Sequence, residues 1–146
     1  MDQGGALPDL EGVMGYQLKR AAMTLRARMD HDLRELGLTV PQFACLELLA
    51  QRPGLSNAEL ARGAFVTRQS MNLVLRGLQD RGLVTRPDTV NHGRARPTEL
   101  TPQGRRLLRA ASICVADIEA RMTAPLNPTQ QDQVLAGLRA MINALK

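Results

Sequence analysis

The clearest pattern near the start of the chain is a helical repeat of apolar positions. Between about residues 10 and 37, apolar side chains recur every three to five residues, at Val13, Leu18, Ala21, Ala22, Leu25, Met29, Leu33 and Leu36. The spacing predicts an amphipathic helix of about 26 residues, roughly 40 Å long at 1.5 Å per residue. Gly37 ends this helix, which is longer than a lone small domain needs.

A second helix is predicted from Pro41 to Gln51. Thr39 and Gln42 have the spacing of a capping box, and a proline in the first turn costs little there because its missing amide would be unpaired anyway. The side chains expected in the core are Phe43, Leu46, Leu49 and Ala50. A Pro-Gly pair at positions 53 and 54 then predicts a turn.

The next stretch predicts two helices separated by a tight turn. Ser56 and Glu59 form a second capping box, so a helix begins at Ser56. Residues 64–66 make the turn, and Thr67 offers a capping hydroxyl to a helix that runs to Arg81. Helical spacing gathers four apolar residues of that helix into one core-facing stripe: Met71, Val74, Leu75 and Leu78.

A short hairpin is predicted after this helix. Gly82 ends the helix, where positive φ is wanted. Leu83–Arg86 and Pro97–Thr101 are the expected strands, and the polar tip between them carries Arg94 and Arg96. A hairpin with an arginine tip beside such a helix is a wing.

Two further helices close the chain. One begins at Thr101 and Pro102 and can run to about Met122, and the other begins at Asn127 and Pro128. Their apolar stripes are Leu107, Leu108, Ala111, Val115, Ile118 and Met122, and then Val134, Leu135, Leu138, Met141, Ile142 and Leu145.

The predicted fold is therefore mainly α with a small β-hairpin wing, in the order α-α-α-α-β-β-α-α. We expect one domain over residues 1–146, with a winged helix-turn-helix lobe at 39–101 and dimerisation helices at 10–37 and 102–146. The apolar faces of these terminal helices are most simply buried in a symmetric homodimer. Each large apolar side chain that stays exposed lacks the stabilisation of about 1.5 to 3 kcal/mol that its burial would contribute. The alternative is a monomer whose terminal helices fold back on its own core.

The helix after the tight turn carries candidate DNA-reading residues on its outer face. At about 100° per residue, Gln69, Asn72 and Arg76 lie almost opposite the apolar stripe. Glutamine and asparagine pair with adenine, and arginine with guanine, in the major groove. The other candidates flank the helix start: Thr67, Arg68 and Ser70. Arginines on an amphipathic helix are more commonly a solvated surface, but the order of caps, turn and basic hairpin favours DNA binding.

The distribution of charge along the chain also favours DNA binding. The chain carries +5 overall, while residues 62–109 hold ten arginines and three acidic residues, a net +7 that leaves −2 for the remainder. Such a local surplus suits binding to phosphates. The chain has one tyrosine, two phenylalanines and no tryptophan. Since single-strand and RNA binders stack bases on aromatic side chains, duplex DNA is favoured.

The sequence gives little support to other classes of protein, such as enzymes, metalloproteins and membrane proteins. No phosphate-binding loop, dinucleotide-binding glycine pattern or HExxH motif is present, so we expect no enzyme, no metal and no cofactor. Without an apolar leader or a membrane-spanning run, a cytoplasmic protein is expected. Cys45 and Cys114 have no paired-cysteine spacing, and both are more commonly core thiols than redox sensors.

Nearly the whole chain resembles the MarR family of bacterial transcriptional regulators. The likeness is densest in LTVPQFACLELLAQRPGLSNAELARGAFVTRQSMNLVLRGLQDRGLVTR and in TELTPQGRRLL. It implies a dimeric winged-helix repressor or activator of palindromic operators, released by small phenolic or lipophilic molecules or, in a subset, by thiol oxidation. The wing differs from the family pattern of Asp-x-Arg: it reads His92, Gly93, Arg94, keeping the arginine without the aspartate.

The resemblance also implies an effector pocket between the dimer helices and the DNA-binding lobe. Four residues are candidates to line it: Tyr16, Met23, Phe43 and Glu47. Each is as easily a core or surface residue.

Three functions remain open from the sequence. The first is a sequence-specific, effector-responsive repressor that binds double-stranded DNA as a homodimer. The second is a dimeric winged-helix module for protein interaction without operator specificity, which would not need Gln69, Asn72 and Arg76. A thiol-based oxidant-sensing regulator is a third. The operator, the regulated genes, the effector and the sign of regulation are not encoded in any pattern of the chain.

Overall fold

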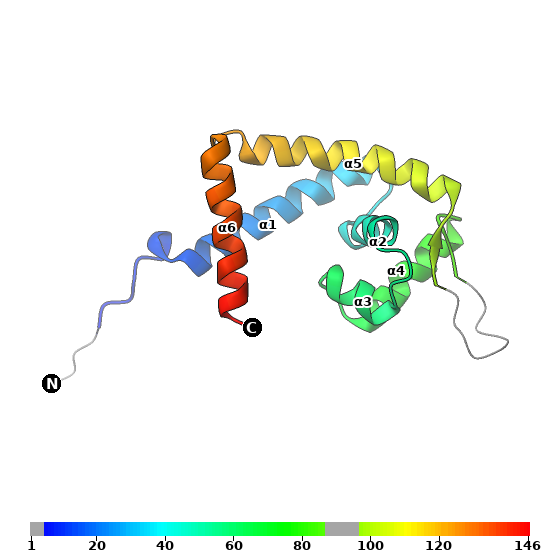
Figure 1. Cartoon of the computed structure of the whole chain (residues 1–146), viewed down its shortest axis with the longest axis horizontal. Coiled ribbons are helices and arrows are strands. Elements are labelled where there is room, and N and C mark those ends of the chain that lie inside the picture. Colours follow the sequence, from blue (N-terminus) through cyan, green and yellow to red (C-terminus); the bar gives the residue numbers. More distant parts are fainter. Residues whose placement is uncertain (1–4, 87–96) are drawn as a thin grey trace. The chain divides into compact units, whose positions relative to one another are not determined.

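The computed structural model of the chain describes residues 5–86 and 97–146, and it is mainly helical with one two-stranded hairpin (Figure 1). The helices are α1 (Met14–Leu33), α2 (Val40–Gln51), α3 (Asn57–Gly63), α4 (Arg68–Asp80), α5 (Pro102–Thr123) and α6 (Pro128–Ala144). The strands are β1 (Val84–Thr85) and β2 (Glu99–Leu100), and 3-10 turns η1 (Leu10–Gly12) and η2 (Arg34–Leu36) flank α1. This order confirms the predicted fold class.

The chain forms two compact units, Met1–Ala111 and Ser112–Lys146, which divide within α5. The first contains α2, α3 and α4, which pack on one another. The division falls inside the segment 102–146 that the sequence assigned to dimerisation.

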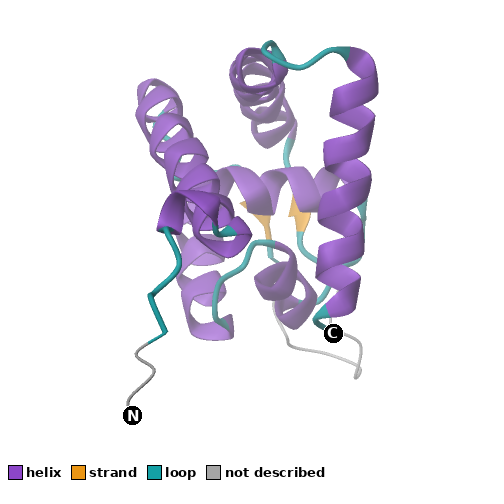
Figure 2. Ribbon diagram, turned by 90° about the vertical axis from the view of Figure 1, so that its left-hand side faces the viewer, coloured by secondary structure: helices purple, strands orange, loops and turns teal. Residues whose placement is uncertain are grey.

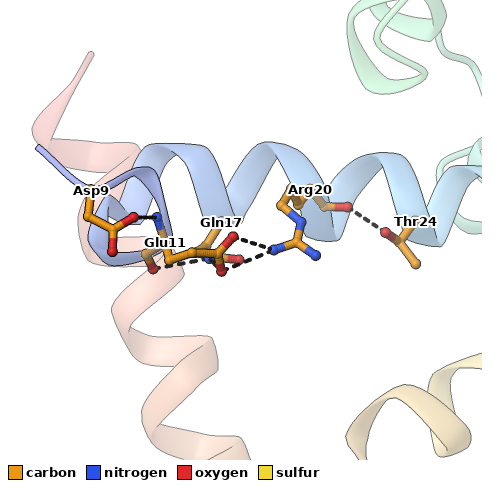
Figure 3. Close-up of polar contacts among 5 residues, drawn as sticks. All are labelled: Asp9, Glu11, Gln17, Arg20 and Thr24. Atoms are coloured by element: carbon orange, nitrogen blue, oxygen red, sulfur yellow. Dashed lines mark hydrogen bonds and ion pairs between the residues drawn. The ribbon is translucent and has the colours of Figure 1, made fainter. Parts of the chain in front are cut away.

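The first helix is shorter than predicted, because a capped turn interrupts its start (Figure 3). The Asp9 carboxylate accepts a hydrogen bond from the Glu11 amide at 3.2 Å, and Val13 is extended, with φ −91° and ψ 116°. Glu11 then accepts a hydrogen bond from Gln17 at 3.1 Å and pairs with Arg20 at 3.3 Å. Because a short acidic side chain offers the backbone a local alternative to helix, the regular helix begins only at Met14.

The predicted caps of the helix-turn-helix are present. Thr39 and Gln42 form a complete capping box at the start of α2, as do Ser56 and Glu59 at the start of α3. Hydrogen bonds from Ser56 lower the pKa of Glu59, since they stabilise its carboxylate. At the start of α4, the Thr67 hydroxyl accepts a hydrogen bond from the Ser70 amide at 3.0 Å.

The core of the first unit confirms the predicted stripe of α4 and corrects one residue of α2. Large side chains from three helices and from the residue before β1 are fully buried in it: Leu46, Leu60, Met71, Leu75, Leu78 and Leu83. Val74, at the edge of the α4 stripe, is half-buried. The prediction that Ala50 is buried was wrong, because α2 turns Cys45 into the core instead, and Ala50 is exposed.

The hairpin, whose two strands are orange in Figure 2, is shorter than predicted, and α5 follows it directly in the chain. Val84 pairs with Leu100 and Thr85 with Glu99, in antiparallel register. Gly82 has a φ of 72°, as its position after α4 requires. The predicted wing arginines, Arg94 and Arg96, and the neighbouring His92 lie outside the described residues.

The second unit contains the end of α5 and the whole of α6. Asn127 and Gln130 form a capping box at the start of α6. Gln131 donates hydrogen bonds to the carbonyl oxygens of Thr123, at 3.2 Å, and Leu126, at 3.0 Å, so the turn between the helices is held by a side chain. Within the described residues, no helix is both long enough and apolar enough to cross a membrane.

Candidate nucleic-acid interface

Helix α4 has one buried face and one exposed face. Met71, Leu75 and Leu78 are at most 1% exposed. All six described DNA-binding candidates are exposed: Thr67, Arg68, Gln69, Ser70, Asn72 and Arg76. The packing of α4 therefore leaves the predicted reading side chains in solvent, where they could meet a base edge.

The two hydroxyls at the start of α4 already have partners within the chain. The Thr67 hydroxyl donates to the Ser70 hydroxyl at 3.0 Å and also accepts from the Ser70 amide. These contacts fix the first turn of the helix. Thr67 and Ser70 thus hold the turn that presents Arg68 and Gln69.

Asn72 is tied to helix α3. The Asn57 amide group donates a hydrogen bond of 2.5 Å to the Asn72 side-chain oxygen. The bond uses one lone pair of that oxygen and leaves the Asn72 amide hydrogens available as donors. Asn57 was not a predicted site residue, and its own side-chain oxygen is buried without a hydrogen-bond partner in the described part of the chain. Packing of α3 on α4 therefore orients one of the candidate base-reading side chains.

Some arginines of the chain form ion pairs with carboxylates, and others do not. Those of α1 are paired with carboxylates, Arg26 with Asp30 at 3.3 Å and Arg28 with Asp32 at 3.1 Å. A hydrogen bond from His31, followed by the charge of Arg28, lowers the pKa of Asp32. Among the described residues, no carboxylate pairs with five exposed arginines of the segment 62–109: Arg68, Arg76, Arg105, Arg106 and Arg109.

Arg81 has a structural contact. Its guanidinium donates a 2.6 Å hydrogen bond to the carbonyl oxygen of Gly37. This bond joins the end of α4 to the connection between α1 and α2. Arg81 was counted in the basic surplus, and the structure gives this side chain a partner within the fold.

Two exposed apolar residues at α4 were missed by the sequence reasoning. Phe65, in the turn before α4, is 95% exposed and has a φ of 60°. Leu73, one turn after Gln69, is 62% exposed. Leu73 could have been found as an apolar residue on the polar face of the helical wheel.

The four effector candidates differ in their burial. Phe43 is buried in the core, Tyr16 and Glu47 are half-buried, and Met23 is 72% exposed. A surface pocket of about 320 Å³ is lined by other residues of α2, α3 and their connection: Leu48, Arg52, Leu55, Glu59, Arg62 and Gly63. A role for the four candidates remains a prediction.

The MarR family profile matches residues 36–95, the segment that contains α2, α3, α4 and the first strand of the hairpin. The chain is 49% identical over 118 residues to the HTH-type transcriptional repressor Rv2887 of Mycobacterium tuberculosis, covering 81% of this chain and 85% of that protein. It is also 29% identical over 129 residues to the transcriptional regulator HosA of Escherichia coli O111:H-, covering 88% and 94% of the two chains.

Solved structures show the same fold. A crystal structure of the Mycobacterium tuberculosis protein Rv2887 in complex with salicylic acid superposes with a TM-score of 0.74 at 44% identity, covering 94% of this chain and 98% of that one. The transcriptional repressor CouR bound to a 23-mer DNA duplex gives a TM-score of 0.81 at 30% identity, with 97% and 98% covered. The chain therefore belongs to the MarR family of winged helix-turn-helix transcriptional regulators.

Proposed function

We propose that the protein is a homodimeric repressor that places α4 in the major groove of a palindromic DNA operator. The observation that carries this proposal is the shared exposure of Gln69, Asn72 and Arg76 opposite the buried stripe of α4. A protein-interaction module would not need this combination, whose hydrogen-bonding groups match adenine and guanine edges. Two copies of the helix on a two-fold axis would read half-sites about one helical turn apart, or a multiple of that distance.

The proposed wing contact lies beside this groove. Arg94 and Arg96, at the predicted tip of the hairpin, would meet the neighbouring minor groove, which offers mainly shape and negative potential. The exposed arginines without carboxylate partners would add phosphate contacts. Together they would supply affinity, while α4 supplies sequence preference.

The proposed effector is a small aromatic acid that lowers DNA affinity. Support comes from the relative Rv2887, which has been solved in complex with salicylic acid and with p-aminosalicylic acid. The candidate lining residues are Tyr16, Met23, Phe43 and Glu47. Oxidant sensing through Cys45 has less support, because burial raises the pKa of Cys45 to about 12 and keeps that thiol protonated.

The test begins by selecting bound sequences from a random duplex pool at physiological salt. Arg76→Ala should then cost about 1 to 3 kcal/mol on the selected operator and little on a scrambled duplex, because it removes a base contact. Arg94→Ala should weaken both duplexes more evenly and reduce the salt dependence of binding. Arg139→Ala removes an exposed arginine from α6 and is the matched control, with both affinities unchanged.

An equal loss on both duplexes with Arg76→Ala would contradict the proposed orientation of α4. Repeating the titration of the wild type with salicylate examines the effector. Operator affinity should fall as salicylate is added, and an affinity that stays constant would remove aromatic acids of this type from the proposal.

A further inference from the structure

Phe65 occupies an unusual place in the turn between α3 and α4. Its side chain is 95% exposed, and its φ of 60° is the only positive value among the described residues other than glycine. The turn is closed by hydrogen bonds from the Phe65 amide to the Arg62 carbonyl, at 3.3 Å, and from the Val66 amide to the Ala61 carbonyl, at 3.0 Å. A bulky residue is disfavoured in this left-handed conformation, which glycine or asparagine adopts more easily.

The packing of the free chain does not account for the phenylalanine. An aromatic ring that is almost wholly exposed contributes little to the core, and its contact with water is unfavourable. The left-handed turn itself needs only a residue that tolerates positive φ. What phenylalanine adds at this position is an apolar surface for a partner outside the fold.

A second exposed apolar side chain lies within the reading surface of α4. On a helical wheel of about 100° per residue, Leu73 falls about 40° from Gln69 and about 60° from Arg76, on the outer face. Its side chain is 62% exposed. The outer face is therefore not uniformly polar, because a leucine lies beside Gln69 at the edge of the three candidate hydrogen-bonding residues.

We propose that Phe65 and Leu73 contact the C5-methyl groups of thymines and so add an apolar part to operator readout. This inference rests on the proposed binding of α4 in the major groove. The thymine methyl group is the apolar feature that the four standard bases present there, and apolar side chains recognise it. Phe65 precedes the N-cap Thr67 by two residues, and the first turn of a recognition helix is the part that meets base edges.

The surroundings of these two residues favour DNA over a second protein as the partner. Leu73 lies beside Gln69 and Arg76 on the helical wheel, and Phe65 comes three residues before Arg68. Arg68 and Arg76 are exposed and have no carboxylate partner in the described part of the chain. A protein interface would have to desolvate those groups, whereas duplex DNA offers them phosphates and base edges. The same surface thus matches both the polar and the apolar features of the groove.

The experiment replaces the thymines of the selected operator one at a time with deoxyuridine, which lacks only the methyl group. Wild-type affinity should fall about fourfold at each contacted thymine, the factor expected for one buried carbon. Phe65→Asn and Leu73→Ala should each bind the unmodified operator more weakly. Each variant should also lose its response to deoxyuridine at its own position and keep the response at the other. Leu7→Ala, which alters an exposed leucine outside this surface, is the control.

The melting temperature of the Phe65 variant distinguishes a role of Phe65 in DNA contact from a role in stabilising the fold. Asparagine tolerates positive φ, so Phe65→Asn should melt at or above the wild-type temperature while it loses DNA affinity. A wild type that selects its operator but responds to no deoxyuridine substitution would overturn the thymine contacts and leave the proposed function intact. A wild type that prefers no duplex would instead refute the proposed function.

Discussion

At the scale of single residues, burial decides the chemistry of Cys45. Its side chain has no exposed surface, and desolvation raises its pKa to about 12, although the charge of Arg86 acts in the opposite direction. Oxidants react with the thiolate, which is scarce at neutral pH in such a site. The prediction of a core thiol at position 45 is therefore confirmed, whereas Cys114, on α5, is half-buried.

The raised pKa of Cys45 predicts a loss of stability in alkaline solution. The folded state keeps the thiol proton between about pH 9 and pH 12, while the unfolded chain releases it from about pH 9, the ordinary value. The free energy of unfolding should therefore be unaffected below this window and fall within it, by up to about 1.4 kcal/mol per pH unit. Chemical denaturation at several pH values measures the free energy of unfolding. The difference between the wild type and Cys45→Ala gives the part of its pH dependence that comes from the Cys45 thiol. Parallel pH profiles for the two proteins would refute it.

At the scale of elements, the hairpin and α5 are joined through a close backbone contact. The Thr101 hydroxyl donates to the Gly82 carbonyl at 2.7 Å and accepts from the Gly104 amide at 3.0 Å. The Thr101 amide also donates to the Leu83 carbonyl at 3.1 Å. Because the first turn of α5 lies directly on this carbonyl, the position at Gly104 has no room for a side chain.

Gly104→Ala should destabilise the protein. A Cβ there would lie 2.1 Å from the Leu83 carbonyl oxygen, so the backbone must shift, at a cost of about 1 to 3 kcal/mol. Gly77→Ala is the matched control in the interior of α4, where the nearest atom to a new Cβ is the Gln42 side-chain nitrogen at 3.7 Å. That variant should gain about 0.5 to 1 kcal/mol from helix propensity. Thermal unfolding compares the stability of the two variants. Equal changes in the melting temperature would contradict the close approach of residue 104 to the Leu83 carbonyl.

At the scale of the whole molecule, a single chain leaves many apolar side chains of its terminal segments in solvent. Leu10, Met14 and Leu18 are 55%, 64% and 38% exposed near the start of the chain. On α6 and at its C-cap, the exposed set is Val134, Leu135, Ile142 and Leu145. Burial of each such side chain would contribute about 1.5 to 3 kcal/mol. These faces support the proposed homodimer, since a second copy can cover them.

Removal of residues 127–146 should leave an unstable or aggregating chain, because it takes away α6 and uncovers its proposed partner surface. Sedimentation and thermal melting measure the outcome. A less disruptive variant, Ile142→Asp, should shift sedimentation toward monomer, while Asn143→Asp places the same charge on the neighbouring exposed residue and should not. A soluble, well-folded monomer from the deletion would refute an obligate dimer, and a wild type that sediments as a monomer would refute the dimer itself.

The sequence by itself determined the features that depend on residues a few positions apart. The capping boxes at Thr39 and Ser56, the cap at Thr67 and the apolar stripe of α4 were all predicted and are present. Each rests on hydrogen bonds or side-chain spacing within one or two helical turns, so local residue order is sufficient. The exposure of Gln69 and Arg76 followed, because a helix with one buried stripe turns its other face to solvent.

Tertiary structure alone decided the contacts between distant segments. The hydrogen bond from Arg81 to Gly37 spans 44 positions, and the one from Asn57 to Asn72 spans 15. No periodicity encodes such contacts, because they depend on how helices approach one another. The same reason explains why Ala50 is exposed although it was predicted to be buried: an apolar residue enters the core only where a neighbouring element packs over it.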